Sequence, residues 1–127
     1  DSCNVARASR MGRMPGGQFT IPREIIKAVA NHFHDMAPGT THEATFCCGG
    51  GGGVLTDELL ELRVKGSMPR MGALKQVVDQ HGVNFMATIC AICKAQFTKV
   101  LPYYKFNRGM VGGVHQLVST AIQLGDK

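Results

Sequence analysis

The chain has 127 residues, of which 44% are apolar, and this suits one globular domain with a single core. Its formal charge of +5 is dispersed, and only 6% of the residues are aromatic, so the composition argues against nucleic-acid binding. The sequence contains no apolar run of about 18 residues and no signal segment, which argues against direct membrane insertion and export.

The first third of the chain is expected to form a turn, a helix and a short strand. A Pro-Gly pair indicates a turn over residues 14–17, and Pro22 suits the first turn of the helix that follows. The stretch from His42 to Phe46 is β-compatible, so we expect a strand there. Before it, apolar residues recur at helical spacing until Pro38 ends the pattern, namely Ile25, Ile26, Val29, Phe33 and Met36.

Two helices are predicted in the middle of the chain. Thr56 is a plausible start because an oxygen cap and the acidic residues after it suit the positive end of the helix dipole, and Gly66 ends that helix. The next helix closes at Gly82. One face of it is formed by residues at helical spacing, which are Leu74, Val77, Val78 and His81.

A strand and two further helices are predicted for the remaining residues. The segment from Val83 to Ile89 is typical of a buried strand, and it leads into Cys90. A helix then covers roughly residues 91–100 and is stopped by Pro102. The last helix ends at Gly125, and its apolar face is formed by Val114, Leu117, Val118, Ala121 and Ile122.

This order of elements predicts an α/β domain with a small, mostly parallel sheet flanked by helices. The Cys47–Cys48 pair and Cys90 are expected at the C-terminal ends of strands, the side of such a sheet where ligands usually bind. A strand upstream of Asp1 would bring Cys3 to the same crevice. We therefore expect a single cysteine-rich domain over residues 1–127, as a C-terminal piece of a longer subunit, with all five sulfurs at one site.

The five cysteines form three separate clusters, and none is left over. A structural zinc site uses four ligands, and a disulfide framework favours an even number. In a chain without a secretion signal, such clusters indicate metal or redox chemistry in a reducing compartment, with the cytoplasm favoured. The candidate ligands are Cys3, Cys47, Cys48, Cys90 and Cys93.

The spacing of these cysteines favours a shared site. Cys90 and Cys93 form a Cys-x-x-Cys motif on a first helical turn, which suits either one metal or a redox disulfide of the thioredoxin type. The adjacent pair can reach a common centre only if the backbone turns. Glycines permit that turn and can aim N–H groups at sulfur, so backbone contacts to a cofactor are predicted at Gly49, Gly50 and Gly51. A phosphate loop is disfavoured because Val54, and not lysine, follows the glycine run.

Basic residues near the first cysteine and the glycine loop are expected to balance the charge of thiolates, although an ordinary solvated surface is the alternative. They are Arg7, Arg10, Arg13, Arg63, Lys65 and Arg70. A positive rim that steers an anionic partner is predicted from four of them, Arg7, Arg10, Arg13 and Arg63. Among the histidines, His42 is the one expected near the cysteine ligands, and the others are interpreted as surface or core residues.

Three motifs carry a resemblance to a known family over nearly the full chain. Asp1-Ser2-Cys3, the Phe46-Cys47-Cys48-Gly49-Gly50-Gly51 segment and Cys90-Ala91-Ile92-Cys93 resemble the CCG cysteine-rich domain of heterodisulfide reductases and their relatives. The five-glycine run and the Pro22–Ile26 segment most resemble the K subunit of the membrane complex associated with dissimilatory sulfite reductase.

The resemblance implies an oxidoreductase with an iron–sulfur cluster, a non-cubane [4Fe–4S] form held by five cysteines. It assigns the ligands as Cys3, Cys47, Cys48, Cys90 and Cys93. The implied reaction passes electrons to or from a disulfide or trisulfide of a small cysteine-tailed sulfur-carrier protein in dissimilatory sulfur metabolism. The other implied partners are subunits of a membrane-bound redox complex, which would hold the domain peripherally at the cytoplasmic side of the inner membrane.

Two alternatives to the iron–sulfur site remain open at the level of sequence. Thiolates suit zinc as well as iron, so four cysteines can form a structural zinc site in a domain that mediates protein interaction. In a fragment prepared in air, the cluster can also be absent, with the thiols reduced or oxidised to disulfides.

Overall fold

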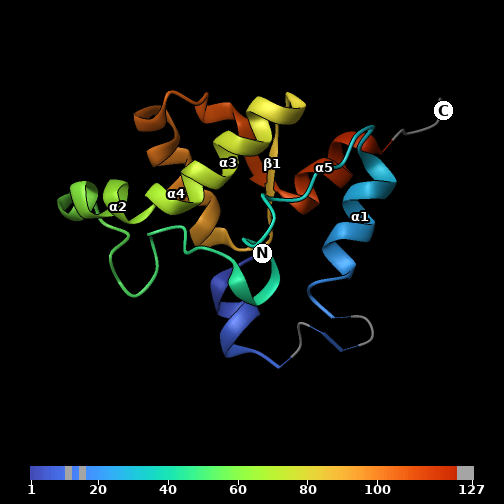
Figure 1. Ribbon diagram of the computed structural model, residues 1–127, viewed down its shortest axis with the longest axis horizontal. Helices are drawn as coiled ribbons and strands as arrows, with labels where there is room; N and C mark the ends of the chain where they lie inside the picture. Colours follow the sequence, from blue (N-terminus) through green and yellow to red (C-terminus); the bar gives the residue numbers. More distant parts are fainter. Residues whose placement is uncertain (11–12, 15–16, 123–127) are drawn as a thin grey trace.

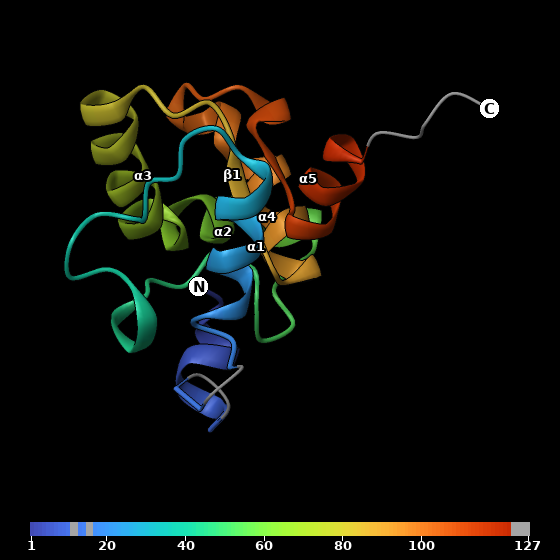
Figure 2. The same ribbon diagram turned by 90° about the vertical axis from the view of Figure 1, so that its right-hand side faces the viewer.

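The structure, a computed structural model, describes residues 1–10, 13–14 and 17–122, and it combines helices with a small parallel sheet (Figures 1 and 2). Five α-helices are described, together with two strands and five short helical turns. In chain order, the elements are η1 (Asn4–Ala8), α1 (Ile21–Val29), η2 (His42–Ala44), η3 (Asp57–Leu59), α2 (Leu60–Gly66), α3 (Met68–His81), β1 (Met86–Thr88), α4 (Ala91–Val100), η4 (Leu101–Tyr104), η5 (Arg108–Met110), β2 (Val111–Gly113) and α5 (Val114–Ala121).

The two strands form the centre of the domain. They pair in parallel, with Met86 opposite Val111 and Thr88 opposite Gly113. Both views show β1 between α3 and α5 (Figures 1 and 2). Helix α4 packs against both strands, and α5 packs against both strands and α1. This arrangement confirms the predicted small α/β fold.

The main core lies between α3, α4 and the sheet, and it includes two of the cysteines. Its buried members are Cys48, Met71, Leu74, Met86, Cys93, Phe97, Val100, Leu101, Met110 and Val111. Among the helices in the described part of the chain, none is long and apolar enough to cross a membrane.

Four predicted helices are confirmed. Helices α2 and α3 end at Gly66 and just before Gly82, as expected. Helix α4 covers the predicted residues, with Pro102 in the turn that follows it. Helix α5 lies where the last apolar face was predicted, although its predicted stop, Gly125, lies outside the described residues. The predicted turn is supported by a hydrogen bond from the Gly17 amide to the Met14 carbonyl at 2.7 Å, while the Pro-Gly pair itself lies outside the described residues.

The first helix is shorter than predicted, because it ends at Val29 and the chain then reverses. A continuous helix would separate residues 23 and 35 by about 18 Å along its axis, at 1.5 Å per residue. In the structure, Nε of Arg23 donates to Oδ2 of Asp35 at 2.8 Å. The same guanidinium donates to Oδ2 of Asp1 at 2.6 Å. These ion pairs stabilise the reversal, which apolar spacing alone does not reveal.

The predicted strand from His42 to Phe46 is wrong. Its first three residues form η2, and the rest is irregular. The carbonyl oxygens of this segment accept hydrogen bonds from arginine side chains instead of from a neighbouring strand, as with Nη1 of Arg7 and the Thr45 oxygen at 2.6 Å. Cys90 therefore follows a strand closely, as predicted, whereas the Cys47–Cys48 pair follows an irregular segment.

Strand β2 was not predicted, because two of its three residues are glycines, which are depleted in strands. A Cβ on Gly112 would lie 2.7 Å from Cζ of Phe85, so a larger residue there would require this ring to shift. Strand β1 is also shorter than predicted, three residues instead of the whole 83–89 segment.

A buried polar network joins α2, α4 and the glycine loop. Nε2 of Gln96, which is fully buried, donates to the Cys48 carbonyl at 3.0 Å and to the Arg63 carbonyl at 3.1 Å. Its Oε1 accepts from Nε of Arg63 at 2.8 Å. This network fixes the backbone of Cys48 against α4.

Replacing Gln96 with leucine should therefore destabilise the protein strongly. The substitution leaves Nε of Arg63 and the Cys48 carbonyl without their partner, at a cost of roughly 1–3 kcal/mol for each buried group. The free energy of unfolding in urea should fall by about 3 kcal/mol. The exposed Gln80→Leu on α3 is the control and should change it by less than ~0.5 kcal/mol. Equal stabilities of the two variants would contradict the role of this network.

Candidate metal centre

All five cysteines line one cavity of about 510 Å³. Cys3 lies just before η1, the adjacent pair lies in the loop that leads to the glycine run, and Cys90 and Cys93 lie at the start of α4. None of the five forms a disulfide. The structure thus brings together every cysteine of the chain from three distant segments, as the sequence predicted.

The thiols form a continuous chain of contacts. Neighbouring thiols interact electrostatically in the order Cys3, Cys47, Cys48, Cys93 and Cys90. Cys47 is exposed, whereas Cys48 and Cys93 are buried in the core. The site therefore extends from the protein surface to the hydrophobic interior.

The two buried cysteines are electrostatically distinct. The thiol of Cys93 donates to the sulfur of Cys48, and this hydrogen bond is the main reason why the pKa of Cys48 is lowered to about 6. The Gly50 amide and the positive charge of Arg70 act in the same direction, while burial opposes them. The pKa of Cys93 is raised by its bond to Cys48 and by burial. This arrangement favours the thiolate at Cys48 and the thiol at Cys93.

Two glycines are required by the geometry of the loop. Gly49 has φ +88°, and a Cβ on it would lie 2.8 Å from the Ser67 amide nitrogen. A Cβ on Gly50 would lie 2.8 Å from Cβ of Gln96. Both amides donate to sulfur, Gly49 to Cys47 at 3.3 Å and Gly50 to Cys48 at 3.4 Å. Gly51 lines the cavity, but a Cβ on it would meet nothing within 4 Å.

Arg70 and Arg7 hold the cysteine segments together. Arg70 reaches from α3 to the Phe46 carbonyl, with its Nε at 3.1 Å, and to the Asp1 carbonyl, with its Nη2 at 3.2 Å. Nη1 of Arg7 donates to the Glu43 carbonyl at 3.0 Å. Both arginines therefore connect the segment around Cys3 to the segment before Cys47.

The predicted positive rim needs one correction. Arg63 is only 4% exposed, and its guanidinium donates to Gln96 and to the Thr56 carbonyl, so it cannot face a partner. Arg7, Arg10 and Arg13 are exposed, and Arg7 lines the cysteine cavity. The sequence could not reveal that Arg63 is buried, because its charge favours a surface position.

His42 contacts other groups than the cysteines. Its backbone amide donates to Oδ2 of Asp1 at 2.7 Å, and its ring packs edge-to-face on Phe19 with 4.6 Å between the ring centroids. Burial, followed by the charge of Arg23, lowers the pKa of His42. His42 therefore stabilises the N-terminal segment and does not contact the candidate metal ligands.

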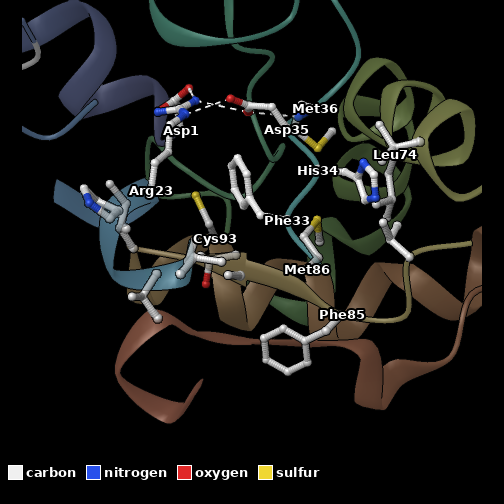
Figure 3. Close-up of a pocket in the computed structure, with 18 of the residues that line it drawn as sticks. Asp1, Arg23, Phe33, His34, Asp35, Met36, Leu74, Phe85, Met86 and Cys93 are labelled. Carbon is white, nitrogen blue, oxygen red and sulfur yellow. Dashed lines mark hydrogen bonds and ion pairs between the residues drawn. The ribbon is translucent and has the colours of Figure 1, made fainter. Parts of the chain in front are cut away.

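A larger cavity of about 690 Å³ meets the cysteine cavity at Cys3, Cys48, Cys90 and Cys93. Figure 3 shows Cys93 beside Phe33 and Met86 in this cavity, with Arg23 bonded to Asp1 and Asp35 at its edge. The rings of His34 and His81, which also line it, stack with centroids 4.0 Å apart. Sequence reasoning did not identify this cavity, because its walls come from segments far apart along the chain.

The five thiols are candidate ligands for a metal centre. Within the described ranges, no three His, Cys, Asp or Glu side chains are arranged to hold one metal ion. The five thiols instead surround a cavity, and thiolates are the ligands of iron–sulfur clusters as well as of zinc.

Placing alanine at Gly49 should disturb this loop. A left-handed backbone costs a non-glycine residue about 1–2 kcal/mol, and the contact with Ser67 adds to that cost. The reduced, metal-free Gly49→Ala protein should therefore unfold at least ~2 kcal/mol more easily than the unsubstituted protein in urea. Gly51→Ala is the matched control and should have little effect. A Gly49→Ala protein as stable as the control would show that the loop adapts.

Curated relatives match nearly the whole chain. The Hdr-like menaquinol oxidoreductase iron-sulfur subunit of Archaeoglobus profundus is 45% identical over 124 residues, which are 98% of this chain and 21% of the relative. The Hdr-like menaquinol oxidoreductase iron-sulfur subunit 2 of Archaeoglobus fulgidus is 44% identical over 122 residues, which are 96% of this chain and 20% of the relative. No protein-family model and no solved structure matches the chain.

The chain spans about a fifth of the length of the curated relatives that it matches. Within that fifth, the match covers 96–98% of this chain, at 44–45% identity. The chain is therefore related by sequence to one segment of Hdr-like menaquinol oxidoreductase iron–sulfur subunits.

Proposed function

We propose that this chain is the iron–sulfur domain of an Hdr-like oxidoreductase subunit, with its five cysteines as cluster ligands. The observation that carries the proposal is the single cavity lined by all five cysteines. The names of the relatives, which are iron–sulfur subunits, agree with it. The proposed cluster is a [4Fe–4S] form with the five ligands Cys3, Cys47, Cys48, Cys90 and Cys93, which is the non-cubane type.

The composition of the site favours this cluster over structural zinc. A tetrahedral zinc site is complete with four ligands and would leave one cysteine of the connected set without a role. A cluster of several irons can use ligands that stand around a cavity, as these thiols do. The charge of Arg70, at the buried side of the site, also favours a strongly anionic occupant.

In this proposal, some residues of the site hold the cluster, and others leave it accessible to a substrate. The cysteine thiolates would hold the irons, and the amides of Gly49 and Gly50 would donate to the sulfurs of Cys47 and Cys48. When bound, the cluster supplies one-electron transfer at a site that a sulfur compound can reach. Cys47, which is exposed, marks the side from which that approach is possible.

We further propose a reaction at a sulfur–sulfur bond. Reductive cleavage of a disulfide takes up two electrons and two protons and gives two thiols, and the reverse reaction releases them. The proposed substrate is the cysteine tail of a small sulfur-carrier protein, as in the K subunit that the motifs resemble, in dissimilatory sulfur metabolism. The exposed Arg7, Arg10 and Arg13 are candidates for contacts with an anionic carrier.

The electrons would be exchanged with other subunits. The relatives are named menaquinol oxidoreductase subunits, and menaquinol gives up two electrons and two protons when it is oxidised to menaquinone. We propose that this chain carries the site at which the sulfur substrate of such a complex reacts, and that it lies peripherally at the cytoplasmic side of the membrane. The part of the relatives outside the matched fifth would supply the electron path.

Replacing single cysteines with serine should remove iron, because an alcohol is a poor ligand for iron–sulfur clusters. Anaerobic preparations of Cys47→Ser, Cys48→Ser, Cys90→Ser and Cys93→Ser should each contain less than about half of the unsubstituted iron per chain. Cys3→Ser should follow the same trend. Iron, acid-labile sulfide and zinc are measured on the same samples.

Ile92→Ser is the matched control, because Ile92 lines the same cavity between two of the cysteines but is not a thiol. It should retain the iron and sulfide content of the unsubstituted protein. Zinc in place of iron, lost in the cysteine variants, would favour the structural zinc domain. Iron that persists in all of the cysteine variants would overturn the ligand assignment.

A further inference from the structure

Arg70 lies between the cysteine segments and is only 5% exposed. Its guanidinium donates to the carbonyl oxygens of Asp1 and Phe46 and to the hydroxyl of Thr45. Thr45 in turn donates to the Asp1 carbonyl at 3.0 Å. All of these acceptors are uncharged, and they stand within two residues of Cys3 and Cys47.

The charge of Arg70 has no carboxylate partner. Over residues 1–10, 13–14 and 17–122, no salt bridge joins Arg70 to an Asp or Glu, whereas Arg23 is paired with Asp1 and Asp35. A buried cation without a counter-charge is costly. Arg70 lines the larger cavity together with Cys3, Cys48 and Cys93. Its charge acts on these thiols and on the N-terminal amine of Asp1, and the thiols are the groups among these that can become negative. We therefore expect the negative charge that balances Arg70 to lie at the cysteine site.

We infer that Arg70 is the internal counter-charge and positioning residue of the cysteine site, and that it raises the reduction potential of the cluster bound there. The inference rests on the proposed function. One electron added to the cluster increases its negative charge by one unit, and a fixed cation in a low-dielectric interior favours that more negative state. Removing the cation should make reduction harder. Its hydrogen bonds act separately, by holding Cys3 next to Cys47.

Three variants separate charge from position. Arg70→Met removes both the charge and the hydrogen bonds. Arg70→Lys keeps the charge but loses the planar guanidinium group that donates to several acceptors at once. Lys75→Met is the control, because Lys75 lies on the same helix as Arg70 but is exposed and ion-paired with Asp79. Iron per chain is measured on anaerobic samples, and the midpoint potential is measured by titration with dithionite, followed by visible absorbance.

The expected result is a more negative midpoint potential for Arg70→Met than for the unsubstituted protein. Arg70→Lys should keep a potential close to that of the unsubstituted protein but bind less iron, and Lys75→Met should leave the potential unchanged. Equal potentials for Arg70→Met and the unsubstituted protein would overturn the inference. So would a shift in Lys75→Met as large as that in Arg70→Met, because the loss of any positive charge on this helix would then explain both.

A second measurement covers the case in which Arg70→Met takes up no iron. In the reduced, metal-free protein, a double-mutant cycle compares the unfolding of Arg70→Met, Cys48→Ala and the double variant, and Lys75→Met with Cys48→Ala serves as the parallel control. A counter-charge role predicts non-additive effects for the Arg70 cycle that exceed those of the control. Additive effects would overturn it. Absence of iron from the unsubstituted protein would count against the proposed function, while this cycle would still test Arg70.

Discussion

Hydrogen bonds from arginine side chains to backbone carbonyl oxygens hold the cysteine segments of this protein in place. The segment before the Cys47–Cys48 pair has no neighbouring strand, so its polar backbone must find other partners. Arg7 and Arg70 donate to the carbonyl oxygens of Glu43, Thr45 and Phe46. Because Arg70 also reaches the Asp1 carbonyl, one buried side chain fixes two of the three cysteine-bearing segments relative to each other.

The third segment is positioned by regular structure. Strand β1 leads to Cys90, and α4 then presents Cys93 to the core. The two halves of the site meet at the hydrogen bond between Cys48 and Cys93, and Gln96 locks the Cys48 carbonyl against the same helix. The site is thus attached to the core on one side, through Cys48 and Cys93, and is open to solvent on the other, at Cys47. This arrangement can retain a charged cofactor while leaving one face within reach of a substrate.

The sequence predicted the parts that depend on local pattern. Apolar spacing and Gly or Pro stops located α2 to α5, and cysteine spacing identified five thiols that the structure brings to one cavity.

The sequence-based predictions failed where charged residues far apart in the sequence determine the local structure. Arg23 stabilises the early end of α1 through Asp35, twelve residues away, and Arg7 and Arg70 replace the strand expected over residues 42–46. Strand β2 was missed because two of its three residues are glycines, and the close approach of Gly112 to Phe85 is a contact that no local pattern encodes. The charge of Arg63 predicts a surface position, but the side chain is buried because it pairs with Gln96, 33 residues away.

The central claim is that the five-cysteine cavity holds one multi-iron cluster. Native mass spectrometry of the chain, prepared and sprayed without oxygen, tests it most directly, because it gives the metal composition of the intact protein. The account predicts one dominant species that carries about four irons with their sulfides and that loses them together when an iron chelator is added. A species that carries a single zinc ion, or one that remains metal-free after reconstitution with iron and sulfide, would contradict it.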